Sequence, residues 1–258
     1  MPPPSSTSPE AGLTRAALHE LSRWNAPSVF NGWEQITEHD TATEGVNLEP
    51  TVDLMPELPP MVGYASTLEI ESGNPEHRQA NPDAVGQYLR YIADQPGPTV
   101  VVVRDRTPPE RVGSFWGEVN ANIHRALGCI GTITDGGMRD IEEMHGIGFR
   151  ALARRVCVGH AHAYPIRWGE PVEVFGRRVE PGQLIHADSH GFLAIPREDE
   201  PRLLEATRFM DEMECTHLIP PMRNAAGRTR EEVLDDLDHG LKSFIAEVAT
   251  KFSGRTEF

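Results

Sequence analysis

The sequence predicts an α/β protein built on a parallel sheet, and two observations support this. Between residues 83 and 150 the pattern alternates helix, strand, helix, strand, helix, which is the order of βαβ crossovers. Inside that stretch, Val100 to Val103 form an uninterrupted β-branched run, typical of a strand buried on both faces. The 258 residues suffice for one large domain with additions or for two small domains, and a hydrophobic content of 38% can fill a core.

The N-terminal part predicts a helical arm followed by a strand. Residues 1–9 are rich in proline and serine and are expected to be disordered. Apolar residues then recur near the helical period, which predicts an amphipathic helix: Leu13, Ala17, Leu21 and Trp24. A second helix is expected around residues 29–36. The proline-rich segment 49–60 predicts a connector, and the alternating residues of 61–71 predict a strand.

The central part supplies the expected crossovers. A helix is predicted over residues 83–94, then the buried strand that contains Val100 to Val103, then a helix over 118–127. The next apolar run, G-C-I-G-T-I-T-D-G, predicts a strand that ends at Asp135-Gly136, because Asp-Gly is typical of turns.

The C-terminal part changes character twice. Short strands separated by turns are predicted between residues 153 and 196, and helices over 203–213 and 231–252. The α/β domain with its arm is therefore expected to span residues 10–200. Residues 201–258 are expected to form a helical extension that packs on that domain or on a neighbouring subunit.

Composition excludes several classes of function. Acidic residues outnumber basic ones by 39 to 24, and no basic cluster offsets the net charge of −15, so no nucleic-acid partner is expected. The N-terminus has no signal-peptide core and the apolar runs are too short to span a bilayer, so no membrane partner is expected. The widely spaced Cys129, Cys157 and Cys215 suggest no disulfide framework, which favours the cytoplasm. Cys129 and Cys157 are interpreted as small core residues.

The densest set of chemically useful residues lies between Gly131 and Asp140. Ligands collect at the carboxyl ends of parallel strands, where Asp135, Arg139 and Asp140 are expected. A carboxylate is a suitable ligand for magnesium or manganese, and a guanidinium can bind a carboxylate or a developing enolate oxygen. The alternative is that Arg139 and Asp140 are a solvated pair at a helix start with Asp140 as its cap, and that Asp135 only caps local backbone.

Glu118 follows a glycine at a strand-to-helix junction. Alone it is typical of a first-turn glutamate favoured by the helix dipole. Because the two strands that precede Glu118 and Asp140 are expected to be neighbours, both carboxylates can reach one crevice beside Arg139.

Three histidines are further candidates for a pocket. His160 and His162 are two residues apart, so on a strand both would face one side, where they could bind metal or substrate. Two neighbouring histidines without a ligand role are the alternative. His190 precedes Gly191 in a predicted turn, where it can line a pocket or stabilise the turn.

Three motifs resemble one known family in the same order. Glu118, then twenty residues, then Arg139-Asp140 resembles the acidic-x20-Arg-Asp signature of the class II pyruvate aldolases, the 4-hydroxy-4-methyl-2-oxoglutarate aldolases of the RraA-like family. The G-x-x-x-D-G turn at Gly131 and V-E-P-G-Q-L-I-H-A-D-S-H-G-F-L-A-I-P over residues 179–196 are similar to its other motifs. The resemblance covers roughly residues 25–200.

This resemblance implies a swivelling β/β/α-type fold, assembled as trimers or hexamers with active sites between subunits. It also implies that Asp140 binds magnesium or manganese, with Glu118 acting on the metal through water. Arg139 would contact the substrate, and backbone amides from Gly117 through Glu118 to Val119 would hold its carboxylate. The catalytic residues would thus be Arg139, Glu118 and Asp140.

The expected function is that of a metal-dependent lyase. It would cleave a carbon–carbon bond of a small 2-oxo acid, by retro-aldol reaction or decarboxylation, through a pyruvate-like enolate. One alternative is another metal-dependent lyase or hydrolase that uses the histidines. Another is a non-catalytic regulator that binds a protein; relatives of that kind tend to lack the acid matching Glu118. Helices continue beyond Pro196, where compact members end, so the acceptor portion of the substrate stays open.

Overall fold

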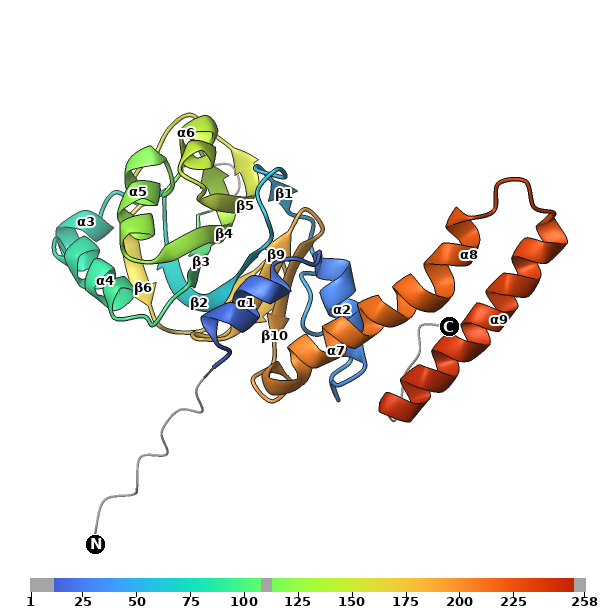
Figure 1. Ribbon diagram of the computed structural model, residues 1–258. Helices are drawn as coiled ribbons and strands as arrows, with labels where there is room; N and C mark the ends of the chain where they lie inside the picture. The colour runs from blue at the N-terminus through green and yellow to red at the C-terminus, as the bar shows by residue number, and fades with distance from the viewer. Residues whose placement is uncertain (1–11, 108–112, 253–258) are drawn as a thin grey trace, which may run out of the picture.

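A parallel sheet forms the centre of the computed structural model, which describes residues 12–107 and 113–252 (Figure 1). Its four parallel strands are β2 (Met61–Ile70), β3 (Thr99–Asp105), β4 (Cys129–Met138) and β5 (Arg150–Val156). Val102 pairs with Thr67 on one side and with Ile133 on the other. The expected disorder of residues 1–9 lies outside the described residues.

Antiparallel strands extend this sheet at both sides. The strand order is β1-β5-β4-β3-β2-β9-β10, and β6 also pairs with β2. The added strands are β1 (Val52–Asp53), β6 (Pro165–Trp168), β9 (Leu184–Asp188) and β10 (Gly191–Ile195). A separate hairpin joins β7 (Val172–Val174) to β8 (Arg177–Val179). The α/β fold with a parallel central sheet, expected from the sequence, is confirmed.

Two apolar cores lie on the two faces of the sheet. On one face α4 (Ala84–Ala93), α5 (Glu118–Ala126) and α6 (Ile141–Gly146) cover Val101 and Val103, and the short α3 (His77–Ala80) precedes them. On the other face Val100 and Val102 pack against the strands β7 to β10. This division follows from the alternation of side chains along β3.

Helices from the N-terminal and C-terminal parts of the chain pack together over β9 and β10. Here α1 (Arg15–Leu21) and α2 (Ala26–Glu34) meet α7 (Glu200–Met213) around the buried Trp33. Tyr64 Oη donates to Glu200 Oε1 and accepts from the Leu13 amide at 2.6 Å, which links the first helix to the last part of the chain.

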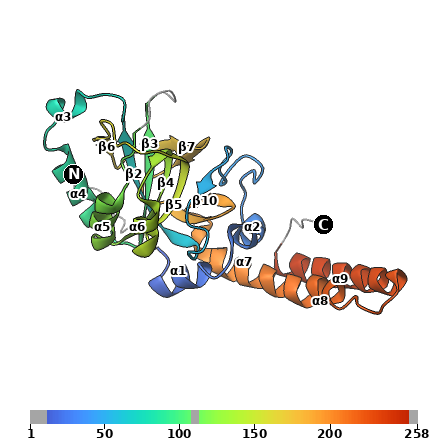
Figure 2. The same ribbon diagram turned by 90° about the horizontal axis from the view of Figure 1, so that it is seen from above.

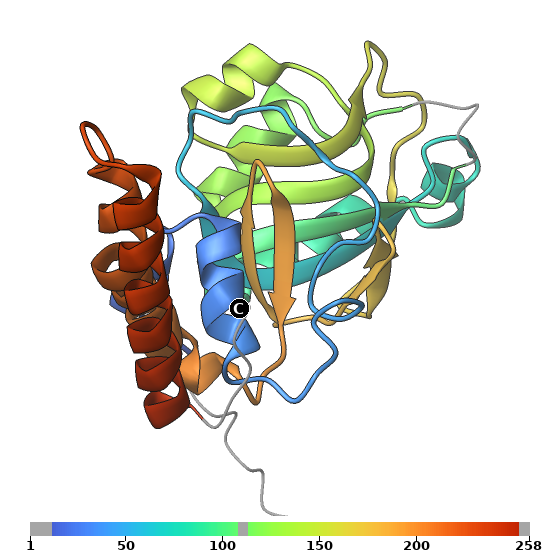
Figure 3. The same ribbon diagram turned by 90° about the vertical axis from the view of Figure 1, so that its right-hand side faces the viewer.

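The remaining helices project away from the sheet (Figures 1 and 2). After α7 the chain passes through a π-helix (Glu214–Leu218) into α8 (Ile219–Arg223) and then returns along α9 (Arg230–Lys251). Phe244 and Val248 of α9 pack on Met210 and Met213. Figure 3 shows α7 to α9 beside the curved sheet rather than on it. Within the described residues, this C-terminal extension therefore contacts the rest of its own chain through α7.

Two expectations about the strands are wrong. Strand β4 does not end at Asp135-Gly136 but continues to Met138 with an irregular register between Thr134 and Gly137. The Asp135 carboxylate accepts the Asp105 amide of the neighbouring strand at 2.7 Å, so it does not cap a turn. The strand before the paired histidines ends at Val156, which places His160 and His162 in a loop.

Candidate functional site

The site lies at the carboxyl ends of the parallel strands. Strand β4 ends at Met138, level with Val156 of β5, and Arg139 and Asp140 follow directly. The connection that follows β3 leads into α5, so Glu118 begins its helix at the same edge. Parallel neighbours bring their carboxyl ends to one edge, which is why residues far apart in the sequence meet here.

A single carboxylate oxygen, Asp140 Oδ2, links the end of β4 to the start of α5. The backbone amide of Glu118 donates to Asp140 Oδ2 at 3.0 Å, and Arg139 Nε lies 3.7 Å from the same oxygen. Asp140 therefore satisfies a free amide at the N-terminal end of α5, where negative charge is favoured by the helix dipole. The structure brings Glu118, Arg139 and Asp140 together, as the sequence predicted.

Asp140 adopts an unusual backbone conformation. Its φ of 55° and ψ of 47° are left-handed, and it precedes α6 without making a side-chain cap to that helix. Such a conformation costs about 1–2 kcal/mol for a residue with a Cβ, although aspartate tolerates it better than most. The interpretation of Asp140 as a cap of its own helix is wrong: its carboxylate binds the start of α5 instead.

Gly117 provides the space for this contact. A Cβ at Gly117 would lie 2.6 Å from Asp140 Oδ2 and 3.1 Å from Arg139 Nε. Any larger residue would displace the carboxylate or the guanidinium. The site therefore requires glycine here for close approach.

The Glu118 and Val119 side chains face outward from this edge. Val119 is 72% exposed, and within the described part of the chain the Glu118 carboxylate has no hydrogen-bond partner. The glutamate can therefore exchange a proton with a bound molecule or a water. The amide of Val119, like other first-turn amides, has no helical partner and can donate to an anion.

Ser114 holds the loop before α5 in place, and the sequence did not identify it. Its hydroxyl lies 2.6 Å from the Trp116 carbonyl and 2.9 Å from the Gly137 carbonyl, and the side chain is 2% exposed. These contacts fix the loop to the end of β4. Its only signal in the sequence is a small polar residue between Gly113 and an aromatic pair, which is too common to be specific.

Cys157 lies beside the site and is only partly buried, so its interpretation as a core residue does not hold. A Cβ placed on Gly137 would be 2.6 Å from its Sγ. Burial raises the pKa of the Cys157 thiol, and the nearby charges of Arg155 and Arg139 oppose that rise. Cys129, by contrast, is buried as expected.

Asp135 lies on the opposite face of the sheet from the helices. Its carboxylate accepts the Asp105 amide and lies 3.4 Å from Arg104 Nε. Burial raises the pKa of Asp135 to about 6, while the Asp105 amide and Arg104 partly offset that shift. Within the described residues Asp135 makes no hydrogen bond or ion pair with Arg139 or Asp140, so it links β3 to β4 and is not part of their cluster.

The histidines are spread over two edges. His160 follows the carboxyl end of β5 and its Nδ1 lies 2.8 Å from the Ala161 carbonyl, while the His162 amide donates to Ser72. His190 lies in the β9–β10 turn, with Nδ1 3.1 Å from Asp188 Oδ1. Since Ala187 pairs with Met61 at the start of β2, His190 is at the edge opposite Asp140 and outside this site.

The oxygen donors of the site suit a hard divalent cation that keeps most of its water. Asp140 Oδ1 has no hydrogen-bond partner within residues 12–107 and 113–252, and its side chain is 35% exposed. The same residues contain no group of three or more His, Cys, Asp or Glu that could hold a metal ion. One available carboxylate fits an ion that keeps several waters, as Mg²⁺ does, and does not fit an all-protein cage.

Fold and site together define an α/β protein with a polar ligand site at the carboxyl edge of a parallel sheet. The family model described as RraA-like, Aldolase/RraA, matches residues 34–194. The chain belongs to this RraA-like family. All the residues of the candidate site lie inside the matched region.

Individual relatives are distant. The chain is 23% identical over 203 residues to a putative 4-hydroxy-4-methyl-2-oxoglutarate aldolase of Halalkalibacterium halodurans, covering 78% of this chain and 85% of that protein. It is 24% identical over 182 residues to Protein DlpA of Legionella pneumophila, covering 68% of this chain but only 27% of that longer protein. It therefore spans about a quarter of DlpA.

A solved structure shares the fold. RraAS2 of Streptomyces coelicolor, described as an unusual member of the RNase ES inhibitor RraA protein family, superposes with a TM-score of 0.62. The superposition covers 80% of this chain and 97% of that one at 20% identity. At this identity the likeness concerns the fold alone.

Among the helices of the described residues, none combines the length and the hydrophobicity of a membrane-spanning segment.

Proposed function

We propose that this protein is a divalent-metal-dependent lyase that cleaves a carbon–carbon bond of a small 2-oxo acid. The observation that carries the proposal is the contact between the Glu118 amide and Asp140 Oδ2 at 3.0 Å, with Arg139 beside it. It brings the residues that carry two carboxylates and one permanent positive charge to an edge where ligands bind in α/β sheets. The similarity to a putative aldolase over 85% of that protein's length supports it.

Asp140 would hold Mg²⁺ or Mn²⁺, with water as the other ligands, and would keep its position through the Glu118 amide. When bound, such an ion polarises a keto oxygen and neutralises negative charge. Arg139 would bind the oxo acid end of the substrate through its planar donors. The unpaired amides at the start of α5, including that of Val119, would add donors for the substrate carboxylate.

The bond-breaking step uses the same residues. The Glu118 carboxylate would accept the proton of the C4 hydroxyl, directly or through a water, as the C3–C4 electron pair moves into the pyruvate part. The charge of Arg139 stabilises the enolate oxygen that develops, which can contribute a few kcal/mol to the barrier. Protonation of C3 then yields pyruvate. In decarboxylation of oxaloacetate, carbon dioxide leaves in place of the carbonyl fragment.

The test is pyruvate release from oxaloacetate and from 4-hydroxy-4-methyl-2-oxoglutarate with Mg²⁺, Mn²⁺ or a chelator. We expect metal-dependent release, which falls about a hundredfold or more in Asp140→Ala because charge stabilisation is lost. Glu142→Ala is the matched control, since this exposed glutamate of α6 is only two residues away. Release that is absent with every metal, or unchanged in Asp140→Ala, would refute the proposal.

A second candidate is a regulator that binds a protein, since the matching family model is described as Aldolase/RraA and one protein of the same fold is described as a member of an RNase ES inhibitor family. Such a module would keep its binding in Asp140→Ala. Absent catalysis together with association between the native chain and an RNase E-type enzyme, measured by titration, would favour this function. Loss of release in the mutant favours the lyase instead.

A further inference from the structure

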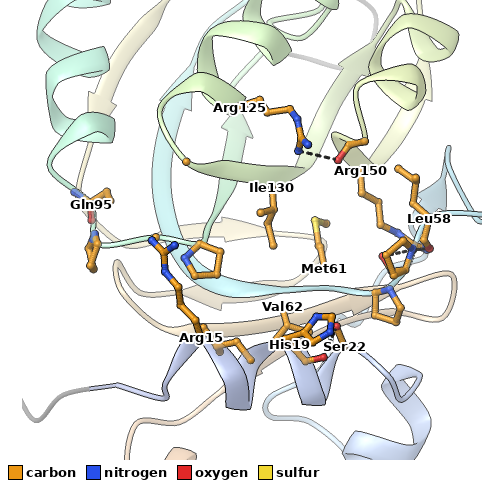
Figure 4. Close-up of a pocket in the computed structure, with 18 of the residues that line it drawn as sticks. Arg15, His19, Ser22, Leu58, Met61, Val62, Gln95, Arg125, Ile130 and Arg150 are labelled. Atoms are coloured by element: carbon orange, nitrogen blue, oxygen red, sulfur yellow. Dashed lines mark hydrogen bonds between the residues drawn. The ribbon is translucent and has the colours of Figure 1, made fainter.

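A cavity of about 660 Å³ opens at the edge of the sheet opposite Arg139 and Asp140 (Figure 4). Its base is formed where the parallel strands begin, at Met61 of β2, Pro98 before β3 and Ile130 of β4. Helix α1 bounds it on one side, and the loops that follow α5 and α6 bound it on the other. Its size is that of cavities that hold small organic ligands.

The walls of this cavity are apolar and rigid. Aliphatic side chains face it from several elements: Leu18, Met61, Val62, Leu127 and Ile130. Prolines supply much of the remaining wall: Pro59, Pro60, Pro96 and Pro98. Because proline fixes its own backbone angle, these segments lose little freedom when a ligand binds. The interior therefore suits an apolar body.

The charged side chains of the cavity are all basic. Its lining residues include Arg15, Arg125 and Arg150 but, among those described, no aspartate or glutamate. This is notable in a chain with a net charge of −15. Arg150 is 3% exposed and its guanidinium is occupied by Asp53 and by the carbonyls of Leu58 and Pro59.

Among the described residues, two of these arginines have no carboxylate partner. Arg15 makes no ion pair in the described part of the chain, and Arg125 makes only a 3.5 Å contact with the Gly148 carbonyl. Figure 4 shows them on opposite sides of the cavity, with His19 on the Arg15 side. Two permanent charges facing an apolar interior attract an anion, and each guanidinium matches a carboxylate or a phosphate in shape.

The C-terminal ends of the helices at this edge repel an anion, but more weakly than the arginines attract it. Helices α4, α5 and α6 all end here, and their last carbonyls carry partial negative charge. That effect amounts to about half a charge per helix and fades within one turn. These carbonyls can accept a hydrogen bond from a ligand hydroxyl, while the guanidiniums set the sign of the preferred ligand.

We propose that this cavity binds a small organic anion, whose carboxylate or phosphate head is attracted by the positive charges of Arg15 and Arg125 and whose apolar body lies between α1 and Ile130. This site is separate from the proposed catalytic edge, since the two lie at opposite ends of the same strands. Failure of the lyase assay would leave it untouched.

Calorimetric titration of the full chain with octanoate, octyl phosphate and octan-1-ol tests this proposal. We expect at least one of the two anions to bind, and octan-1-ol to bind about tenfold more weakly. The double variant Arg15→Gln/Arg125→Gln should lose about tenfold or more in affinity for the anion. Arg223→Gln is the control, because Arg223 is an exposed arginine on the distant α8.

A substitution in the apolar wall of the cavity provides an independent test. Ile130→Ala should weaken anion binding through the lost apolar contact while leaving the preference for charge intact. The proposal is overturned if neither anion binds, or if the double arginine variant binds as the native chain does. A third outcome also overturns it: the native chain forms an oligomer that binds no anion, and Arg125→Glu dissociates that oligomer. A second copy of the chain would then occupy the cavity.

Discussion

Asp140 combines an unfavourable backbone conformation with a contact that few other side chains could make. Its left-handed φ of 55° turns the chain between β4 and α6, and Oδ2 then reaches the Glu118 amide at 3.0 Å. Strain held in this way is common where a side chain must be aimed at a ligand. The geometry thus separates Asp140 from the many aspartates that simply cap helices.

Gly117→Ala should damage the site while Gly86→Ala should not. A Cβ at Gly117 would overlap Asp140 Oδ2, whereas a Cβ at Gly86 of α4 meets nothing within 4 Å. We expect Gly117→Ala to lose about 1–3 kcal/mol of unfolding free energy. It should also lose at least about tenfold in pyruvate release, since the displaced carboxylate no longer sits beside Arg139. Gly86→Ala should gain about 0.5–1 kcal/mol. Urea unfolding and the pyruvate assay measure both; equal behaviour of the two variants would contradict the assigned role of Gly117.

Asp135 predicts a pH dependence of stability. Burial raises its pKa from 3.8 to about 6, so the folded protein holds this proton more tightly than the unfolded chain. Stability from this group is therefore greatest below pH 3.8 and is lost as the pH rises through 6, by up to about 3 kcal/mol. Asp135→Asn keeps an oxygen for the Asp105 amide but has no charge, so it should gain stability relative to the native chain between pH 5 and pH 7.5.

Urea unfolding of both proteins at those two pH values isolates Asp135. The buried His186, whose pKa is lowered by burial, changes stability in the opposite direction with pH and is common to both proteins. Identical pH dependences in the native chain and in Asp135→Asn would show that the carboxyl is ionised freely in the folded state.

For individual residues, the sequence could predict where the site lies but not which atoms are in contact there. Glu118 and Asp140 were expected in one crevice because their strands are neighbours, and the strand pairing confirms that arrangement. The sequence could not show which group binds Asp140, since that depends on a left-handed residue that is not glycine. It also placed His160 and His162 on a strand, whereas the positive φ of Ala161 at 43° bends the chain into a loop.

The C-terminal hairpin of helices is the element that differs most from the compact domain. Helix α9 packs on α7, the π-helix and α8, and its buried residues are few. A capping box begins it, in which Thr229 accepts the Glu232 amide and the Glu232 carboxylate accepts the Thr229 amide. Since packing is limited, this cap carries an unusual share of the helix's stability.

Thr229→Ala should therefore loosen α9 without affecting the site. We expect a loss of about 1 kcal/mol, seen as roughly fivefold faster amide exchange in the first turns of α9. Pyruvate release should stay unchanged. Thr250→Ala, near the other end of α9, removes a hydroxyl that only binds the Ala246 carbonyl and should have a smaller effect. Equal exchange rates in both variants would show that the capping box does not hold the helix.

Sequence periodicity predicted the helices well because their apolar stripes face a core. The helix expected over residues 231–252 is observed as Arg230–Lys251. Prediction from the sequence failed where tertiary contacts overrode a local signal. Asp135-Gly136 has the composition of a turn, but pairing with β5 on both sides of it, at Thr134 and again at Gly137, carries the strand through. The π-helix at Glu214–Leu218 has no sequence signature of its own.

The whole molecule exposes apolar side chains around the proposed catalytic edge. Val119 is the neighbour of Glu118, Val156 ends β5 and Val158 follows that strand, and the three are 72%, 58% and 93% exposed. Exposed apolar groups beside a polar site are typical of a subunit interface. They support the expectation of a trimer or hexamer with sites between subunits.

We therefore expect light scattering to give a trimer or hexamer mass for the native chain. Val158→Asp should shift it towards the monomer and reduce pyruvate release, because a charge placed in an interface is costly to bury. Leu234→Asp is the matched control, since Leu234 is 63% exposed on the projecting hairpin. A native monomer, or an assembly that tolerates Val158→Asp, would exclude this interface.

The projecting hairpin also makes the chain selectively addressable by thiol chemistry. Cys215 lies exposed on the π-helix between α7 and α8, whereas Cys129 is buried and its pKa is raised by burial to about 12. Only a thiolate reacts readily with maleimides, and burial also raises the pKa of Cys157. A dye attached to Cys215 would thus mark the C-terminal helices, so that energy transfer between labelled copies would report the separation of these helices in any assembly the chain forms.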